Sequence, residues 1–149
     1  MNSYPDYDDK TLSQLRMHEC QGTIIGGMKV AQLTGMSAEE YGYQMMKLQQ
    51  VDWSRAKSAA KIAQVFWQHF QTTYGFGSKL EVREDNNTVI LTMPPLEQSA
   101  EYQLNHWSAT AKELQDIQRG YWRAITELCG LRSKLNFYPD QHQVILYRD

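Results

Sequence analysis

Few side chains in this 149-residue chain have types and positions suited to catalysis. His69 and His106 could act as general acids or bases, and Glu127 and Cys129 lie close together near the end of an expected helix. The tripeptide His-Glu-Cys at residues 18–20 has metal-capable side chains. A metal site needs several ligands in a fixed geometry, and one short cluster does not supply them, so we expect no metal.

Sequence signatures of common enzyme classes are missing. The chain has no Gly-x-Ser-x-Gly nucleophile elbow, no phosphate-binding loop and no His-Glu-x-x-His zinc motif. The segment GTIIGG at residues 22–27 is not a dinucleotide fingerprint, because no strand precedes it and its glycine spacing differs. We expect these glycines to serve close helix packing. Catalysis by His69, His106, Glu127 or Cys129 stays an alternative, and no cofactor is expected.

The charge and composition of the chain limit the classes of partner that it is expected to bind. The net charge of -2 and the pI near 6.1 do not suit a broad basic face, so no nucleic acid is expected as a partner. No window approaches the ~18 apolar residues of a membrane helix. The N-terminus MNSYPDYDDK lacks the apolar stretch of a signal peptide. A soluble cytoplasmic protein without a membrane partner is expected, with Cys20 and Cys129 as free thiols.

The chain carries one pattern twice. Residues 66–93 and 121–148 align with a shift of 55 residues and share Gly-x-x-Ser-Lys-Leu and Val-Ile-Leu in register. Two unrelated segments rarely share such motifs at the same spacing. The sequence therefore predicts an internal duplication, in which each unit is a helix followed by a β-hairpin.

The N-terminal part is expected to be helical. Residues 1–10 are expected to form a frayed arm and residues 11–52 the N-terminal helices. Three glycines within residues 22–27 each weaken a helix by roughly 1 kcal/mol relative to alanine, which predicts a break or kink near Gly22. Ser37, with Glu40 three residues later, is typical of a capping box and predicts the start of the next helix.

The remainder is expected to form the two helix–hairpin units, residues 53–93 and 107–149, of a single domain. The first helix ends at Gly75, and a long helix over about residues 101–129 ends at Gly130. Apolar and polar residues alternate after each glycine, which is typical of strands. A lone hairpin is marginal in water, so the hairpins should join in one four-stranded antiparallel sheet packed by the long helices, an α+β fold.

The repeat also separates scaffold positions from candidate site positions. Trp67 and Trp122 occupy corresponding places and are interpreted either as core or as two aromatic walls of a ligand cavity near a pseudo-twofold axis. His69 and Arg123 have no counterpart of the same type, so the scaffold does not require them. Arg123 and Glu127 are four residues apart and could instead form a surface ion pair.

The motif YGFG at residues 74–77 enters a hairpin that is followed by a helix and a closing hairpin. This order resembles the 4-vinyl reductase domain and the L-2-amino-thiazoline-4-carboxylate hydrolase-like family over about residues 60–149. The resemblance implies a small-molecule-binding or sensing domain with an apolar pocket. Vinyl reductase domains typically carry cysteines in the last helix and closing hairpin, and only Cys129 lies near such a place, so the resemblance implies no metal site here.

Together these patterns predict a domain that binds or senses a small apolar or aromatic molecule in an aromatic-lined pocket. The predicted ligand-binding residues are Trp67, His69, Tyr74, Trp122 and Arg123. A small hydrolase-like enzyme is one alternative. A structural homodimer that pairs through its N-terminal helices is another.

Overall fold

The chain folds into helices and one antiparallel sheet, which confirms the predicted α+β class. The computed structural model describes residues 6–49, 58–86 and 88–148. The described helices are α1 (Asp9–Gln32), α2 (Ala38–Leu48), α3 (Ala59–Tyr74), the 3₁₀ helix η2 (Gly77–Lys79), α4 (Leu96–His106) and α5 (Ala111–Cys129). The strands are β1 (Glu81–Asp85), β2 (Thr88–Met93), β3 (Arg132–Phe137) and β4 (His142–Tyr147). None of the described helices is long and apolar enough to cross a membrane.

The returning strands of the two hairpins form the centre of the sheet. The strand order is β1-β2-β4-β3, and each neighbouring pair is antiparallel. The Val-Ile-Leu triplets of β2 and β4 pair with each other around the opposed residues Ile90 and Ile145. The prediction of one four-stranded sheet made from both hairpins is therefore confirmed.

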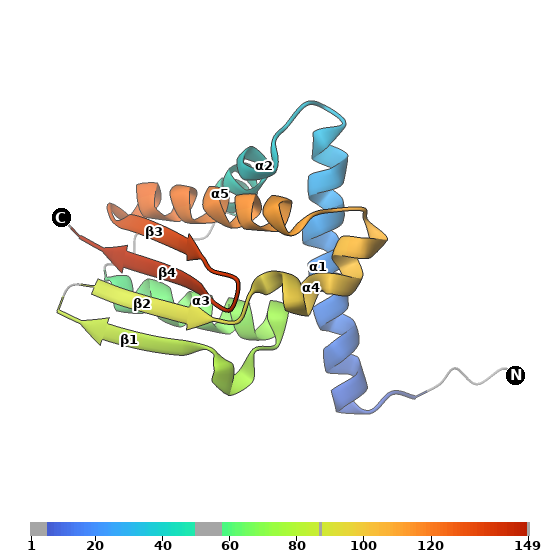
Figure 1. The fold of residues 1–149 in the computed structure, drawn as a ribbon, viewed down its shortest axis with the longest axis horizontal. Coiled ribbons are helices and arrows are strands. Elements are labelled where there is room, and N and C mark those ends of the chain that lie inside the picture. The colour runs from blue at the N-terminus through green and yellow to red at the C-terminus, as the bar shows by residue number, and fades with distance from the viewer. Residues whose placement is uncertain (1–5, 50–57, 87, 149) are drawn as a thin grey trace, which may run out of the picture.

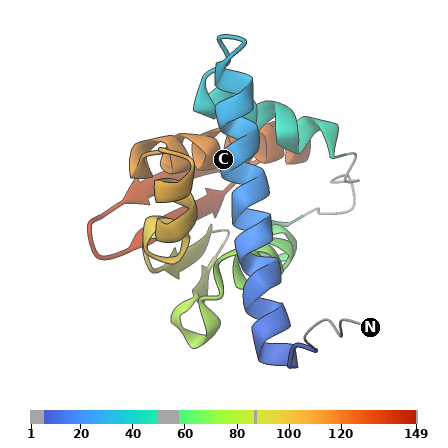
Figure 2. The same ribbon diagram turned by 90° about the vertical axis from the view of Figure 1, so that its right-hand side faces the viewer.

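One face of the sheet packs against helices. In Figure 2 the strands lie to one side of α3 and α5, and in Figure 1 they lie in front of these helices. The side chains of the central strands that point toward the helices are buried: Val89, Leu91, Met93, Val144 and Leu146. The face turned toward the viewer in Figure 1 is covered by none of the described helices. The hydrophobic core thus lies between the sheet and the helix layer.

Helix α1 is a single helix of 24 residues, so the expected break near Gly22 is wrong. It begins at Asp9, after an N-cap in which the Asp8 side chain accepts a hydrogen bond from the Thr11 N–H at 2.7 Å. The frayed arm therefore cannot extend to residue 10, and residues 1–5 lie outside the described residues. The glycines do not break the helix because neighbouring helices pack onto them and compensate for their weak propensity.

The expected long helix over residues 101–129 is also wrong, because two helices occupy this region. Helix α4 begins earlier, at Leu96, and the chain turns at Trp107 and Ser108, where Ser108 has a φ of 49°. Helix α5 then starts with a capping box, in which Thr110 and Glu113 bond each other's backbone N–H groups. The Thr-x-x-Glu signal for this start is present in the sequence.

Glu113 also ties the start of α5 to α1. Its carboxylate accepts hydrogen bonds from Lys29 at 3.0 Å and from Gln32 at 2.8 Å. Burial raises the pKa of Glu113, but the hydrogen bonds from Gln32, from the Thr110 backbone and from Lys29 outweigh it and lower the pKa to about 2. The carboxylate is therefore ionised at neutral pH and bridges two helices.

The internal duplication is not confirmed. The shared order of helix and hairpin is present, and both α3 and α5 end at a glycine in the left-handed conformation, Gly75 at φ 65° and Gly130 at φ 63°. However, the residues that match after these glycines differ in conformation. Residues 77–79 form the 3₁₀ helix η2, whereas residues 132–134 already belong to β3. The first strands of the two hairpins therefore occupy different registers.

Helix α2 packs very closely on α5 through two glycines. A Cβ atom on Gly120 would collide with the carbonyl oxygen of Glu39, and one on Gly42 would collide with that of Ile117. The two backbones thus approach more closely than side chains on either residue would allow. The α2–α5 contact is the largest between any two described helices, so these glycines fix the position of α2.

The substitution Gly120→Ala tests this close approach. Alanine favours a helix over glycine, but its Cβ must displace a backbone carbonyl rather than a flexible side chain. We therefore expect the free energy of unfolding to fall by roughly 1–3 kcal/mol, measured by urea denaturation. Gly22→Ala is the matched control, since its Cβ would meet only the end of the Gln103 side chain at 3.0 Å. Equal stability of the two variants would contradict the account of the α2–α5 contact.

Candidate functional site

The two repeated tryptophans do not form the walls of one cavity. Trp122 is fully buried, and its ring lies 4.1 Å from that of Phe66, measured between centroids. Trp67 is 45% exposed on α3 and borders a surface hollow that also contains Val82 of β1. The difference arises because Trp122 lies on the face of α5 that packs against Phe66 of α3, whereas Trp67 lies on a face of α3 that is open to solvent. Trp122 is thus a core residue, and Trp67 is a surface residue.

His69 and Tyr74 both face the aromatic core. The His69 ring lies between 5.7 and 6.4 Å from the rings of Phe66, Phe70 and Tyr121, and burial lowers its pKa to about 4. The Tyr74 hydroxyl accepts a hydrogen bond from Gln118 at 3.5 Å, and burial raises the pKa of Tyr74. A neutral imidazole and a neutral phenol in these positions stabilise the core.

Arg123 is held by α2. Its guanidinium contacts Glu39 at 2.6 Å and Glu40 at 3.0 Å, and it lies 4.4 Å from the centre of the Tyr43 ring. Glu127 instead accepts a hydrogen bond from the Tyr43 hydroxyl at 2.6 Å. The Arg123–Glu127 ion pair considered from the sequence is therefore replaced by contacts between helices, which leave Arg123 poorly placed to hold a ligand carboxylate.

The catalytic candidates lie on different helices. His69 is on α3, His106 ends α4, and Glu127 and Cys129 are in the last turn of α5. His69 contacts the rings of Phe66, Phe70 and Tyr121, whereas His106 contacts those of Tyr102 and Trp107. Burial raises the pKa of the Cys129 thiol, which disfavours the reactive thiolate. The described residues also contain no group of three or more His, Cys, Asp or Glu side chains able to hold a metal ion.

A groove between α1 and α4 brings several aromatic side chains together. The two helices lie against each other in both views of the fold (Figures 1 and 2). The groove encloses about 660 Å³ and is lined mainly by apolar surface. Four ring side chains contribute to it: His18 from α1, and Tyr102, His106 and Trp107 from α4 and its C-cap.

These rings form a continuous series. The rings of His18 and Tyr102 meet edge to face at 5.7 Å, those of Tyr102 and His106 are stacked at 6.1 Å, and those of His106 and Trp107 meet edge to face at 5.4 Å. Tyr102 remains 65% exposed and Trp107 38% exposed. Aromatic surface is thus presented to solvent in a fixed arrangement.

Glycines of α1 form the floor of the groove. A Cβ atom on Gly26 would lie 2.7 Å from the Trp107 ring, and one on Gly22 would lie 3.0 Å from the Gln103 side chain. The expectation that GTIIGG serves close helix packing is confirmed by these distances. Because the floor has no side chains, the rings of α4 can lie directly against the α1 backbone.

The polar groups of the groove are few and mostly neutral. Gln103 donates a hydrogen bond to the carbonyl oxygen of His18 at 3.0 Å, which links the two walls. Among the described residues that line the groove, Glu19 alone has a carboxylate and none is a lysine or arginine. The site therefore offers ring faces, two imidazoles and one negative charge.

His142 was missed by the sequence analysis, and it holds α4 in place. The first residue of this helix follows Pro95, which has no side chain able to cap it. The Leu96 N–H instead donates to Nδ1 of the buried His142 ring at 3.4 Å, and Nε2 of the ring lies 3.4 Å from Glu97. Burial lowers the pKa of His142, and the Glu97 carboxylate opposes this shift. The cap comes from a strand residue 46 positions away in the sequence, so no local sequence pattern predicts it.

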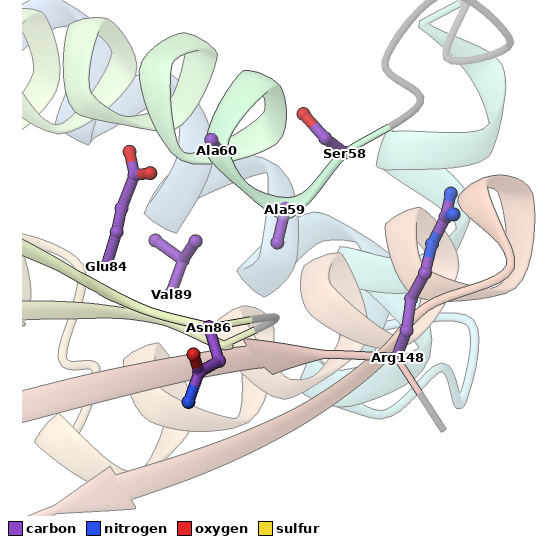
Figure 3. A pocket seen from close by; sticks show the side chains of 7 residues that line it. All are labelled: Ser58, Ala59, Ala60, Glu84, Asn86, Val89 and Arg148. Carbon is purple, nitrogen blue, oxygen red and sulfur yellow. The ribbon is translucent and has the colours of Figure 1, made fainter.

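Two other hollows are weaker candidates. Figure 3 shows a small one of about 170 Å³ where Ser58 begins α3, with Glu84, Asn86 and Arg148 around it. It is smaller than an ordinary ligand pocket. The hollow beside Trp67 encloses about 510 Å³ but has one aromatic residue. The groove between α1 and α4 is therefore the best candidate site.

No protein-family model matches the chain, and no curated protein matches it. The resemblance to the 4-vinyl reductase domain thus stays a prediction, carried by the YGFG motif and the order of elements. A functional assignment must rest on the geometry of the groove.

Replacing His142 with phenylalanine tests its role as the cap of α4. Phenylalanine keeps a ring against Phe137 but leaves the Leu96 N–H without its acceptor. We expect the free energy of unfolding to fall by roughly 1–3 kcal/mol at pH 7, measured by urea denaturation. The exposed His106 provides a control, because His106→Phe should change stability by no more than about 0.5 kcal/mol. If His142→Phe is as stable as the wild type, the capping role is wrong.

Stability should also depend on pH through His69. The folded pKa of about 4 lies below the ordinary value of 6.5, so the unfolded chain binds a proton first as the pH falls. The free energy of unfolding should therefore decrease between about pH 6.5 and about pH 4, by roughly 1–3 kcal/mol from this residue. His69→Phe should lose less stability than the wild type across this range in parallel denaturant titrations. Identical pH profiles would show that His69 titrates normally in the folded protein.

Proposed function

We propose that the protein binds a small planar aromatic molecule in the groove between α1 and α4. The observation that carries this proposal is the series of four rings, His18, Tyr102, His106 and Trp107, over a floor of glycines. The volume of about 660 Å³ lies within the usual range for small-molecule sites. The expected aromatic-lined site is therefore assigned to a different part of the fold from Trp67 and Trp122.

Exposed aromatic surface supports ligand binding rather than stability. Tyr102 gains little from burial at 65% exposure, yet it is fixed between the rings of His18 and His106. An aromatic ligand that stacks on it would bury apolar area at low conformational cost, because the wall is already ordered. The same residue would otherwise leave an apolar patch in contact with water.

The charge of the groove favours neutral or cationic ligands. Of the lining residues that the structure describes, only Glu19 has a carboxylate, and none has a lysine or arginine side chain to hold an acid. Ring faces also attract cations. The nitrogen atoms of His18 and His106 and the amide of Gln103 could direct polar groups at the ring edge. We therefore infer a ligand with an aromatic ring and an amino or neutral polar substituent.

The two helices that form the walls of the groove are each fixed by contacts with other parts of the fold. His142 fixes the first turn of α4, and the Ala109 N–H donates to the carbonyl oxygen of Leu104 at 2.8 Å beyond its last turn. On α1, the Lys29–Glu113 contact at 3.0 Å anchors the helix to α5. A site built on rigid helices loses less conformational entropy when it binds a ligand.

Cellular location and the alternative of self-association through the N-terminal helices also bear on this proposal. Cys20 is an exposed thiol, which supports a location in the reducing cytoplasm. A homodimer through the N-terminal helices would use the surface near Leu15 and Val30, which also borders the groove. Ligand binding and such a dimer would therefore compete.

Calorimetric titration with three probes tests the function: 2-phenylethylammonium, indole and benzoate. We expect the cation and indole to bind and benzoate to bind at least about tenfold more weakly. Tyr102→Ala should weaken binding by about tenfold or more, because the stacking surface is lost. Tyr138→Ala is the matched control, since it removes a tyrosine that is 45% exposed outside the groove.

Three outcomes would overturn the proposal. The groove is not the site if Tyr138→Ala weakens binding as much as Tyr102→Ala does. The inferred charge preference is wrong if benzoate binds best. If none of the probes saturates the wild type at millimolar concentration, the ligand class is wrong.

A further inference from the structure

The outer face of the sheet is an unoccupied surface of defined chemistry. The strand registers arrange its side chains in three rows of four, each running from β1 through β2 and β4 to β3. The rows are Glu81, Thr92, Gln143 and Asn136; then Arg83, Ile90, Ile145 and Lys134; and then Asp85, Thr88, Tyr147 and Arg132. This is the face turned toward the viewer in Figure 1, and none of the described helices crosses it.

The centre of this face is apolar. Ile90 and Ile145 lie directly opposite each other and are only partly buried, although their neighbours along the strands point into the core. Tyr147 and two threonines lie above and below them. An antiparallel sheet with one face in water usually carries polar residues on that face. An apolar centre with a polar rim is instead typical of an interface.

The two edges of the face differ in charge. Glu81 and Asp85 lie in the β1 column, and Arg83 between them is 3.9 Å from Asp85. The β3 column instead contains Lys134 and no acidic residue. The β1 edge is thus acidic on balance and the β3 edge basic, so the face is complementary to itself after a half-turn about an axis parallel to the strands.

We propose that this face binds a second copy of the chain, with the two sheets stacked face to face about such a twofold axis. The half-turn places β2 of one copy over β4 of the other, so that Ile90 meets the partner's Ile145. It also places β1 over the partner's β3 row by row, so that Asp85 lies opposite the partner's Arg132 and Glu81 opposite the partner's Asn136, while Arg83 lies opposite the partner's Lys134. Each contact occurs twice, as a symmetric dimer requires.

The size of the face suits a modest dimer. Four strands about 4.8 Å apart, with about 3.4 Å per residue along each strand, span roughly 19 by 20 Å. Side chains make each face uneven and increase its accessible surface area. Two such faces would therefore bury roughly 1,000–1,400 Å² in total, which is near the lower end of the areas buried in stable interfaces. Association in the micromolar range is therefore expected.

Other uses of the sheet fit less well. Pairing through the β1 edge is disfavoured, because four of its five residues are charged and all are exposed. A nucleic acid would need a basic face with aromatic rings for stacking, whereas this face has isoleucines at its centre and acids along one edge. The surface of α1 near Val30 is a separate candidate for self-association, and the experiment distinguishes it.

Sedimentation velocity between about 1 and about 100 µM protein tests the proposal. The wild type should pass from monomer to dimer across this range. Ile145→Lys should remain monomeric at every concentration, because it places two charges in the apolar centre of the dimer. Val30→Lys, which alters a residue of α1 that is 61% exposed, is the matched control and should dimerise as the wild type does.

Substitutions that exchange charges across the interface provide a second test if Ile145→Lys fails to fold. Asp85→Arg should weaken the dimer at least about tenfold, because the new cation would face the partner's Arg132, and adding Arg132→Asp should restore part of this loss. A wild type that stays monomeric at about 100 µM, or a dimer lost in Val30→Lys and kept in Ile145→Lys, would overturn the proposal. So would a monomer that binds a labelled single-stranded RNA through this face.

Discussion

The fold depends on the absence of side chains at three positions of α1. Gly22 and Gly26 let the Gln103 and Trp107 side chains of the α4 region lie against the α1 backbone, and a Cβ atom on Gly27 would collide with the Tyr41 hydroxyl of α2. One long helix thus receives two neighbours along one stretch of its surface. The end of the Gln103 side chain can yield to a methyl group at Gly22, whereas larger residues at Gly26 and Gly27 would push α4 and α2 away, and the groove would lose its walls.

The same contacts connect the groove to the core. Helix α2 is fixed between α1 and α5 by Gly42 and Gly120. Helix α5 in turn presses Trp122 against Phe66 and covers the inner face of the sheet. Helix α4 is held at its start by His142 from a central strand. The candidate site is therefore a surface feature whose shape is set by interior contacts, which is how a small domain can hold a binding surface rigid.

Local patterns predicted the elements better than their contacts. The helix ends at Gly75 and Gly130 and the four-stranded sheet followed from turn chemistry and alternation. The continuity of α1 could not be predicted, because packing onto its glycines outweighs their weak helix propensity. Trp67 and Trp122 differ in burial because only Trp122 packs against the neighbouring helix, and the repeated pattern does not predict which helix faces meet. The cap from His142 is a long-range contact, so no spacing rule reveals it.

The most direct test of the groove is to follow the indole N–H signals of the isotope-labelled protein by NMR while 2-phenylethylammonium is added. Trp107 lines the groove, whereas Trp67 lies on α3 and Trp122 is fully buried in the core. The account predicts that the Trp107 signal shifts in a saturable way and that the signals of Trp67 and Trp122 stay in place. A saturable shift of Trp67 or Trp122 with no change at Trp107 would contradict it.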